Sequence, residues 1–264
     1  MTDDTFPDPA RLFSLAGRVA LVTGGSRGLG WAMAGALAAA GAHVVLAARD
    51  TTALEAAAAI LSRQGLSAST VAFDVTDEAA ATAAVARTVD AHGRLDVLVN
   101  NAGIVQRTAL ADTGTAEWRA LMAVDLDVCF VLSREAAKPM VTQGWGRIVN
   151  VSSVLGVVTR PEAVTYTAAK HALHGLTKAI AVDLGGTGVT CNALPPGFFA
   201  TEFNAEARND PAFVEQIAGH TPAGRLGEVH ELAGAIVFLA SEASSYVTGH
   251  VLMVDGGMSV AIWA

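Results

Sequence analysis

A tyrosine and a lysine four residues apart give the sequence its clearest candidate chemistry. The segment Tyr166-Thr167-Ala168-Ala169-Lys170 begins a predicted helix, so Tyr166 and Lys170 lie on one helical face. A phenol ionises near pH 10, and a neighbouring ammonium stabilises the phenolate, which favours proton transfer nearer neutral pH. With two tyrosines and three lysines in 264 residues, chance is a weak explanation for this spacing. The pair therefore indicates a tuned acid and base.

Ser153 follows a predicted strand and lies thirteen residues before Tyr166. Its hydroxyl could orient a carbonyl or alcohol oxygen at the edge of the same sheet. A Ser-Ser pair after a strand is otherwise ordinary turn chemistry, and that alternative stays open for Ser153 considered alone.

A glycine-rich turn at residues 23–30, Thr-Gly-Gly-Ser-Arg-Gly-Leu-Gly, supplies a second candidate site. It follows the apolar run 19–22 and precedes the Ala-rich segment 31–40. A dinucleotide pyrophosphate site requires this order of strand, glycine turn and helix. Glycines let the main chain approach phosphates, and the first turn of the helix presents N–H groups and a positive dipole end. An ordinary strand-to-helix turn is the alternative.

The elements that must position these residues alternate along the chain. The strand candidates are continuous apolar runs, which is typical of a parallel sheet covered by helices on both faces. No compositional break divides the chain, so we expect an N-terminal arm, residues 1–13, and one α/β domain, residues 14–264. Strands are expected near 19–22, 43–47, 67–73, 95–99, 147–151, 189–194 and 251–254, and long helices at 115–140 and 163–184.

Residues 198–225 interrupt this alternation. The segment is more polar, contains Pro211 and Pro222, and follows the carboxyl end of a strand. Ligands of open α/β sheets bind at the carboxyl ends of the strands. We therefore expect a mobile cover over the site, with an ordinary pair of surface helices as the alternative.

Composition narrows the classes of function. A net charge of −8 with scattered basic residues argues against a nucleic-acid partner. No charge-free apolar run reaches the length of a membrane span, and the acidic N-terminus does not resemble a targeting peptide. Cys129 and Cys191 have no partner at metal-ligand spacing, so we expect buried thiols and no metal, with a disulfide as the minor alternative. These features predict a cytoplasmic protein.

The motifs together resemble the short-chain dehydrogenase/reductase family over residues 14–258. The resemblance implies a Rossmann-type, doubly wound domain with a seven-stranded parallel sheet, assembled as a homotetramer. It also implies hydride transfer between a nicotinamide and a carbonyl or alcohol carbon. The motifs that carry it are Thr23-Gly24-x-x-x-Gly28-x-Gly30, Asn100-Asn101-Ala102-Gly103, Ser153, Tyr166-x-x-x-Lys170 and Pro196-Gly197.

The same resemblance assigns roles to individual residues. Tyr166 becomes the general acid and base, Lys170 tunes it and holds the nicotinamide ribose, and Ser153 positions the substrate oxygen. Asp74-Val75 is similar to the family's adenine contact, residues 101–103 to the wall beside the adenosine ribose, and residues 196–201 to the flank of the carboxamide. With the glycine turn and Arg49 at the end of the second strand, the other cofactor-binding candidates are Gly24, Ser26, Arg27, Gly28, Leu29, Gly30, Arg49, Asn101, Ala102, Gly103, Pro196, Gly197, Phe199 and Thr201.

One position departs from the family pattern. The family commonly has Asn in a long helix before the serine, feeding a water-mediated proton relay to the lysine, whereas Val124-Asp125-Leu126 carries Asp. A relay that depends on a backbone carbonyl and water would tolerate Asp125. An ionised Asp125 near Lys170 would instead stabilise the ammonium and shift the coupled titration. We expect activity to be retained.

The second strand bears on the choice of cofactor. Rossmann enzymes that use NAD place a carboxylate at its end, but residues 46–49 offer none before Asp50. Arg49 stands there instead, and Arg27 lies in the glycine turn. Two guanidiniums suit a 2′-phosphate, which favours NADP(H) over NAD(H). Two solvated surface arginines, one paired with Asp50, are the alternative.

Softer signals concern the substrate and assembly. Segments 101–107, 221–229 and 238–247 resemble the gluconate 5-dehydrogenase branch, which implies a sugar acid, polyol or small ketone as substrate. Reductases of 3-oxoacyl thioesters on acyl carrier protein share the last two segments and are an alternative, as is a non-catalytic NADP(H)-binding sensor. Arg107 could hold a carboxylate or be an ordinary loop arginine. Apolar long helices and the apolar tail 258–264 indicate a partner surface, which agrees with the homotetramer that the resemblance implies.

Overall fold

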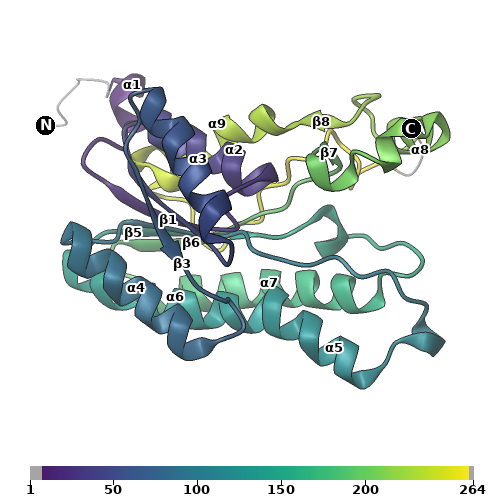
Figure 1. The fold of residues 1–264 in the computed structure, drawn as a ribbon, viewed down its shortest axis with the longest axis horizontal. Coiled ribbons are helices and arrows are strands. Elements are labelled where there is room, and N and C mark those ends of the chain that lie inside the picture. The colour runs from purple at the N-terminus through teal and green to yellow at the C-terminus, as the bar shows by residue number, and fades with distance from the viewer. Residues whose placement is uncertain (1–7, 262–264) are drawn as a thin grey trace, which may run out of the picture.

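The computed structural model describes residues 8–261, and its centre is a six-stranded parallel sheet (Figure 1). The N-terminal arm before Asp8 and the tail residues Ile262, Trp263 and Ala264 lie outside the described residues. The strand order is β3-β2-β1-β4-β5-β6, in which the chain winds in both directions from β1. The strands are β1 (Val19–Thr23), β2 (His43–Ala48), β3 (Ala68–Ala72), β4 (Val97–Asn100), β5 (Gly146–Val151) and β6 (Val189–Leu194).

Helices cover both faces of the sheet, in two layers that Figure 1 shows above and below it. The helices α2 (Gly28–Ala39), α3 (Thr51–Arg63) and α9 (Ala233–Ala240) pack on one face. The helices α4 (Glu78–His92), α6 (Val128–Gln143) and α7 (Val164–Asp183) pack on the other. The remaining helices are α1 (Pro9–Leu12), α5 (Thr115–Met122) and α8 (Pro211–Gly219).

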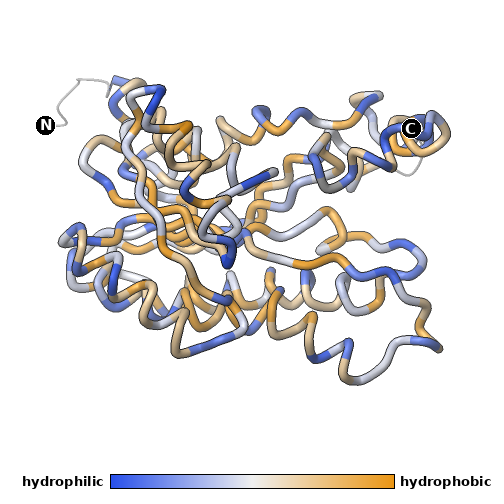
Figure 2. Tube along the Cα trace, in the orientation of Figure 1, coloured by the Kyte–Doolittle hydropathy of each residue, from blue (hydrophilic) through white to orange (hydrophobic). Residues whose placement is uncertain are grey.

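Strand β1 shows why its apolar run is continuous. Its successive side chains point to opposite faces, so Ala20 and Val22 enter one core while Val19 and Leu21 enter the other. All five residues of β1 are buried. Because both faces of the strand are buried, apolar and polar residues need not alternate along it. Figure 2 shows the same contrast, with apolar colours along the sheet and polar colours at turns and helix ends.

The expected seventh strand is reduced to two isolated bridges. Val251 and Val254 lie parallel to the end of β6, where Leu252 N–H donates to Ala193 O at 2.9 Å and Gly197 N–H donates to Val254 O at 2.9 Å. Pro195 and Pro196 lack an N–H, so a regular ladder cannot form between these bridges. The prediction of seven strands was therefore wrong by one, although this segment does run beside the sheet.

The expected long helix over 115–140 contains an irregular turn. A π-helical turn, Ala123–Asp127, separates α5 from α6. Such turns carry one extra residue and are frequent at functional sites. The turn includes Asp125, which is buried.

The segment after β6 forms short pieces of structure. It contains β7 (Phe199–Ala200), which pairs with β8 (Gly227–Glu228), two 3₁₀ turns (Glu202–Asn204 and Ala207–Asn209), and α8. In Figure 1 these elements extend from the upper layer beyond the carboxyl edge of the sheet. Among residues 8–261 no helix is long and apolar enough to cross a membrane.

Candidate functional site

The site lies where the parallel strands end. Because all six strands run in one direction, Thr23, Asn100, Val151 and Leu194 finish at one edge. The residues that follow these ends are the glycine turn, Asn101, Ser153 and Pro196. The parallel topology brings these four predicted segments together at the edge that helix α7 also reaches with Tyr166 and Lys170.

Thr23 joins the glycine turn to the segment after β4. Its Oγ1 accepts hydrogen bonds from the backbone N–H groups of Asn101 at 2.9 Å and Ala102 at 3.0 Å. The amide Nδ2 of Asn101 donates to Thr23 O at 2.9 Å. These bonds hold the turn and the Asn101 segment in fixed register.

Two positions in this turn require glycine for different reasons. At Gly30 the backbone of Gly24 lies so close that a Cβ would overlap Gly24 O. Gly28 has φ +57°, in the left-handed region, and a Cβ there would meet no atom within 4 Å. The start of α2 therefore has an open side, where backbone N–H groups remain available to an anion.

Helix α7 carries Tyr166 and Lys170 on the face turned towards the sheet. The Lys170 Nζ atom lies 5.4 Å from the centre of the Tyr166 ring. Lys170 is buried, and its Nζ donates to Val151 O at 3.4 Å, while Ser152 Oγ donates to Lys170 O at 3.2 Å. These contacts fix the lysine between the end of β5 and the tyrosine.

Asp125 forms a direct ion pair with the lysine. Its Oδ2 lies 3.0 Å from Lys170 Nζ, and its Oδ1 accepts a hydrogen bond from the Ile104 backbone N–H at 2.8 Å. Both side chains of the pair are almost fully buried. The carboxylate therefore connects α7 to the segment that follows Asn101.

The surroundings of Lys170 favour its charged form. Burial is the largest influence and opposes the charge, but the charge interactions of Lys170 with Tyr166 and Asp125 outweigh it and raise the pKa of Lys170. Lys170 is thus an ammonium throughout the neutral range.

Ser153 lies at the start of a 3₁₀ turn, Val154–Gly156, directly after β5. Its Oγ accepts a hydrogen bond from the Leu155 backbone N–H at 3.1 Å, which is the turn chemistry expected of a serine after a strand. The hydroxyl proton stays available for another acceptor. Ser153 and Tyr166 line the same cavity, so the capping role and a substrate-orienting role are compatible.

The cavity at this edge has a volume of about 250 Å³. Ten predicted site residues line it: Leu29, Asn101, Gly103, Ser153, Tyr166, Lys170, Pro196, Gly197, Phe199 and Thr201. Asp125 acts from behind, through Lys170. Arg160, Asn204 and Phe213 also line the cavity. Arg160 was missed because its loop carries no motif, and Asn204 and Phe213 lie in the expected cover, residues 198–225, in which no side chain was singled out.

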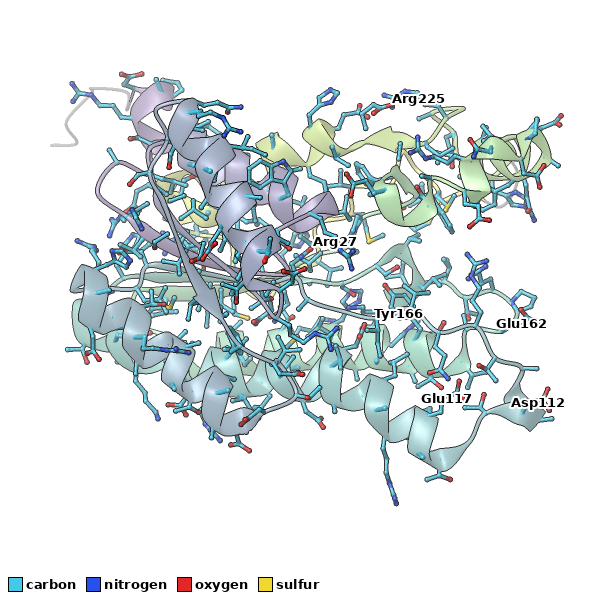
Figure 3. All side chains as sticks on the ribbon, in the orientation of Figure 1. Arg27, Asp112, Glu117, Glu162, Tyr166 and Arg225 are labelled. Atoms are coloured by element: carbon cyan, nitrogen blue, oxygen red, sulfur yellow. The ribbon has the colours of Figure 1, made fainter. Side chains whose placement is uncertain are left out.

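Arg27, Arg49, Asp74 and Val75, which were predicted to lie at the adenosine end, do not line this cavity, whereas Asn101 and Gly103 do. The Arg49 side chain is 76% exposed, and its Nη1 lies 3.9 Å from Asp74 Oδ2. Hydrogen bonds from the Thr76 backbone N–H and then its hydroxyl lower the pKa of Asp74. Figure 3 shows Arg27 at the start of α2, near the edge that holds Tyr166. The adenosine contacts of Asp74 and Val75 stay predictions.

The cysteines belong to the core. Cys129 and Cys191 are buried and free, and burial raises the pKa of the Cys129 thiol to about 12. The expectation of buried thiols is confirmed. Within residues 8–261 no three potential metal-ligating side chains form a group.

Comparison with known proteins decides the family. A family model described as enoyl-(acyl carrier protein) reductase matches residues 24–259. The chain belongs to the short-chain dehydrogenase/reductase family. It is therefore an oxidoreductase that acts on alcohol and carbonyl groups.

Three members of this dehydrogenase/reductase family illustrate the similarity. The gluconate 5-dehydrogenase of Gluconobacter oxydans is 45% identical over 95% of this chain and 98% of its own. A 3-oxoacyl-[acyl-carrier-protein] reductase of Synechocystis is 40% identical over 93% of this chain and 98% of its own. The crystal structure of a gluconate 5-dehydrogenase from Burkholderia cenocepacia, in complex with NADP and tartrate, has a TM-score of 0.93 and 40% identity, over 97% of this chain and 100% of that one.

The glycine turn of this short-chain dehydrogenase/reductase fits a dinucleotide. The open side at Gly28 leaves room for phosphates beside the N-terminus of α2, and Asn101 fixes the neighbouring wall. The cavity that holds Tyr166 continues from Leu29 in this helix to Pro196 and Thr201. One groove can therefore receive a pyrophosphate near α2 and a reacting ring near Tyr166.

A histidine behind this site gives a testable pH effect. Burial, followed by the charges of His171 and other nearby cations, lowers the pKa of His174 to about 4. Below pH 6.5 this histidine is protonated in the unfolded chain but stays neutral in the folded chain. Its contribution to the free energy of unfolding is therefore complete above pH 6.5 and is lost as the pH falls to 4. In chemical denaturation, we expect the free energy of unfolding of His174→Leu to fall by roughly 3 kcal/mol less than that of wild type over this pH range. His230→Leu, at an exposed histidine, is the control, and an unchanged slope for His174→Leu would contradict the assignment.

Proposed function

We propose that this enzyme is an NADP(H)-dependent reductase of a small sugar acid, similar in activity to gluconate 5-dehydrogenase. The observation that carries the proposal is the convergence of Ser153, Tyr166 and Lys170 on one cavity at the carboxyl edge of the sheet. The name of the Gluconobacter relative and its 45% identity support the substrate class. The cofactor, when bound, supplies or receives the hydride.

The chain's own residues then manage the proton and the oxygen. The Ser153 hydroxyl donates a hydrogen bond to the substrate oxygen and orients it. Tyr166 Oη gives a proton to that oxygen during reduction and takes it back during oxidation. The buried Lys170 ammonium stabilises the phenolate left after the proton transfer, and Asp125 holds this ammonium in place.

The preference for NADP(H) follows from the end of β2. Asp50, the first carboxylate after this strand, is occupied because its Oδ1 accepts from the Ala53 N–H at 3.0 Å and caps α3. It is thereby less available to a ribose hydroxyl. Arg49 is exposed and paired only at 3.9 Å, so it can turn towards a 2′-phosphate. Solved relatives with bound NADP support this proposal.

A double variant tests the cofactor proposal. We expect Arg27→Ser with Arg49→Ser to raise the KM for NADPH by about 10- to 100-fold, since charge-assisted hydrogen bonds to phosphate are lost. The KM for NADH should change little, because NADH lacks this phosphate. Arg63→Ser, at an exposed arginine in the last turn of α3, is the control. Equal effects on both cofactors would contradict the assignment.

A substrate panel tests the proposed activity. Purified enzyme with NADPH is given 5-ketogluconate, a β-keto thioester and a simple ketone, and with NADP⁺ it is given gluconate. We expect the sugar acid 5-ketogluconate to give the highest kcat/KM. A preference for the thioester would favour the carrier-protein alternative, although the net charge of −8 disfavours docking of an acidic carrier. Tight NADPH binding without any turnover would favour the sensor.

We also propose a homotetramer in the cytoplasm. Phe130 on α6 is 47% exposed and Val182 on α7 is 79% exposed, although both are large and apolar. Free buried cysteines suit a reducing compartment. Light scattering should give a tetrameric mass, and a monomeric mass would contradict the assembly.

A further inference from the structure

Two arginines that line the catalytic cavity form no ion pair with a carboxylate among the described residues. Arg107 and Arg160 both line the cavity that holds Ser153 and Tyr166. Among the described residues, neither belongs to an ion pair with a carboxylate. The Nε atom of Arg160 is buried and has no hydrogen-bond partner there. A buried guanidinium N–H without an acceptor is unfavourable, and an anionic ligand would correct it.

The two arginines come from loops that the fold joins. Thr108 and Ala163 form a parallel bridge, in which the Thr108 N–H donates to Glu162 O at 3.2 Å. The Thr108 hydroxyl in turn donates to Glu117 Oε1 at 2.9 Å, which fastens the loop to α5. Arg107 and Arg160 flank this junction, and Figure 3 shows the labelled Glu162 and Glu117 to the right of Tyr166.

The backbone next to Arg160 is strained. Glu162 has φ +60°, and within residues 8–261 it is the only non-glycine residue in the left-handed region. Such conformations persist where the surrounding structure imposes them and are frequent at functional sites. Here the conformation lets the Arg160 segment turn from the Ser153 turn into α7.

The positive charges of Arg107 and Arg160 repel each other. Burial and then the charge of Arg107 lower the pKa of Arg160, while the charge of Glu162 only partly offsets them. Arg160 nevertheless keeps its charge, because a guanidinium is not deprotonated in proteins. An anion between them would relieve the repulsion and give the buried Nε an acceptor.

From this geometry we propose that Arg160, together with Arg107, binds the carboxylate of the substrate and makes the enzyme select acids over neutral polyols and ketones. This inference rests on the proposed function. The apolar residues Ile104, Val154 and Phe213 supply much of the remaining lining, so the two arginines are the groups that orient a charged substrate. The carboxylate lies at the mouth, and the reacting carbon lies beside Tyr166 and Ser153.

The test compares an acid with a neutral ketone of similar size. For wild type and variants, with saturating NADPH, the kcat/KM measured with 5-ketogluconate is divided by the value measured with fructose. We expect Arg160→Gln to lower this ratio by about 10- to 100-fold, mainly through KM for the acid. Arg160→Lys keeps the charge but not the planar fork, so a smaller decrease is expected. Arg63→Gln, on the outer surface of α3, is the matched control.

The outcomes separate the two proposals. A wild-type enzyme without activity on either compound would contradict the proposed function and this inference with it. Wild-type activity with an unchanged ratio in Arg160→Gln would overturn the inference alone. An equal loss for acid and ketone would also overturn it, because that result shows a structural role. If Arg160→Gln does not fold, the ratio of kcat/KM for 5-ketogluconate to that for fructose is measured with Arg160→Lys and Arg107→Gln instead, and an unchanged ratio in both would overturn the inference.

Discussion

Tyr166→Phe is expected to lower kcat/KM by about 10²- to 10⁴-fold, the usual contribution of a positioned general acid or base. The substitution removes one hydroxyl and keeps the ring that packs near Lys170. Affinity for NADPH, measured by fluorescence titration, should stay close to that of wild type. The effect should therefore appear in kcat.

The chain offers a matched control for this change. Its other tyrosine, Tyr246, is fully exposed, so Tyr246→Phe removes the same hydroxyl without touching the site. Tyr246→Phe should keep wild-type kcat/KM. If Tyr166→Phe retained more than about a tenth of the activity, Tyr166 would not be the proton donor.

Asp125→Ala is expected to lower the free energy of unfolding by about 3–5 kcal/mol, because it leaves the buried Lys170 ammonium uncompensated. The Ile104 N–H also loses its acceptor. The raised pKa of Lys170 sets the pH range: its contribution is complete below the unfolded value near 10.4 and is lost only as pH rises through the folded value. The loss measured by chemical denaturation should thus be constant between pH 6 and 9.

Asp125→Asn keeps the size and the hydrogen-bond acceptor of the side chain and removes its negative charge. An amide oxygen can still accept from the Ile104 N–H, so the variant should fold and keep its activity within a few-fold. Removing the carboxylate lowers the pKa of Lys170, and the alkaline limb of kcat/KM should move to lower pH. An unchanged rate and pH profile would show that Asp is neutral at this position. A stability loss as large as that of Asp125→Ala would contradict a contribution from the hydrogen bond to Ile104, because Asn keeps this acceptor and lacks only the charge.

Local patterns in the sequence were enough to predict the core of the site. Tyr166 and Lys170 share a helical face because their spacing is four, whatever the remainder of the chain does. The strand, glycine turn and helix at residues 19–39 are also local, and the parallel topology follows from the apolar strands. That Ser153 lines the same cavity as Tyr166 follows from the rule that strand ends share one edge of a parallel sheet.

Contacts between distant segments were not predictable in the same way. The ion pair of Asp125 and Lys170 depends on a π-helical turn and on the packing of that turn against α7. Arg160 became a candidate only when the bridge between Thr108 and Ala163 placed its loop next to that of Arg107. The prediction of a seventh strand was wrong because Pro195 and Pro196 lack the N–H groups needed for regular pairing with residues 251–254. The apolar run 251–254 alone does not reveal this effect.

The most direct test of the account is the fate of the hydride. Wild type and Tyr166→Phe are incubated with 5-ketogluconate and NADPH deuterated at the nicotinamide C4, as each of the two stereoisomers in turn. Mass spectrometry then measures deuterium in the reduced product. The account predicts one deuterium on the new carbinol carbon from one stereoisomer with wild type, and at most trace product with Tyr166→Phe. Tight NADPH binding with no labelled product from wild type would contradict it.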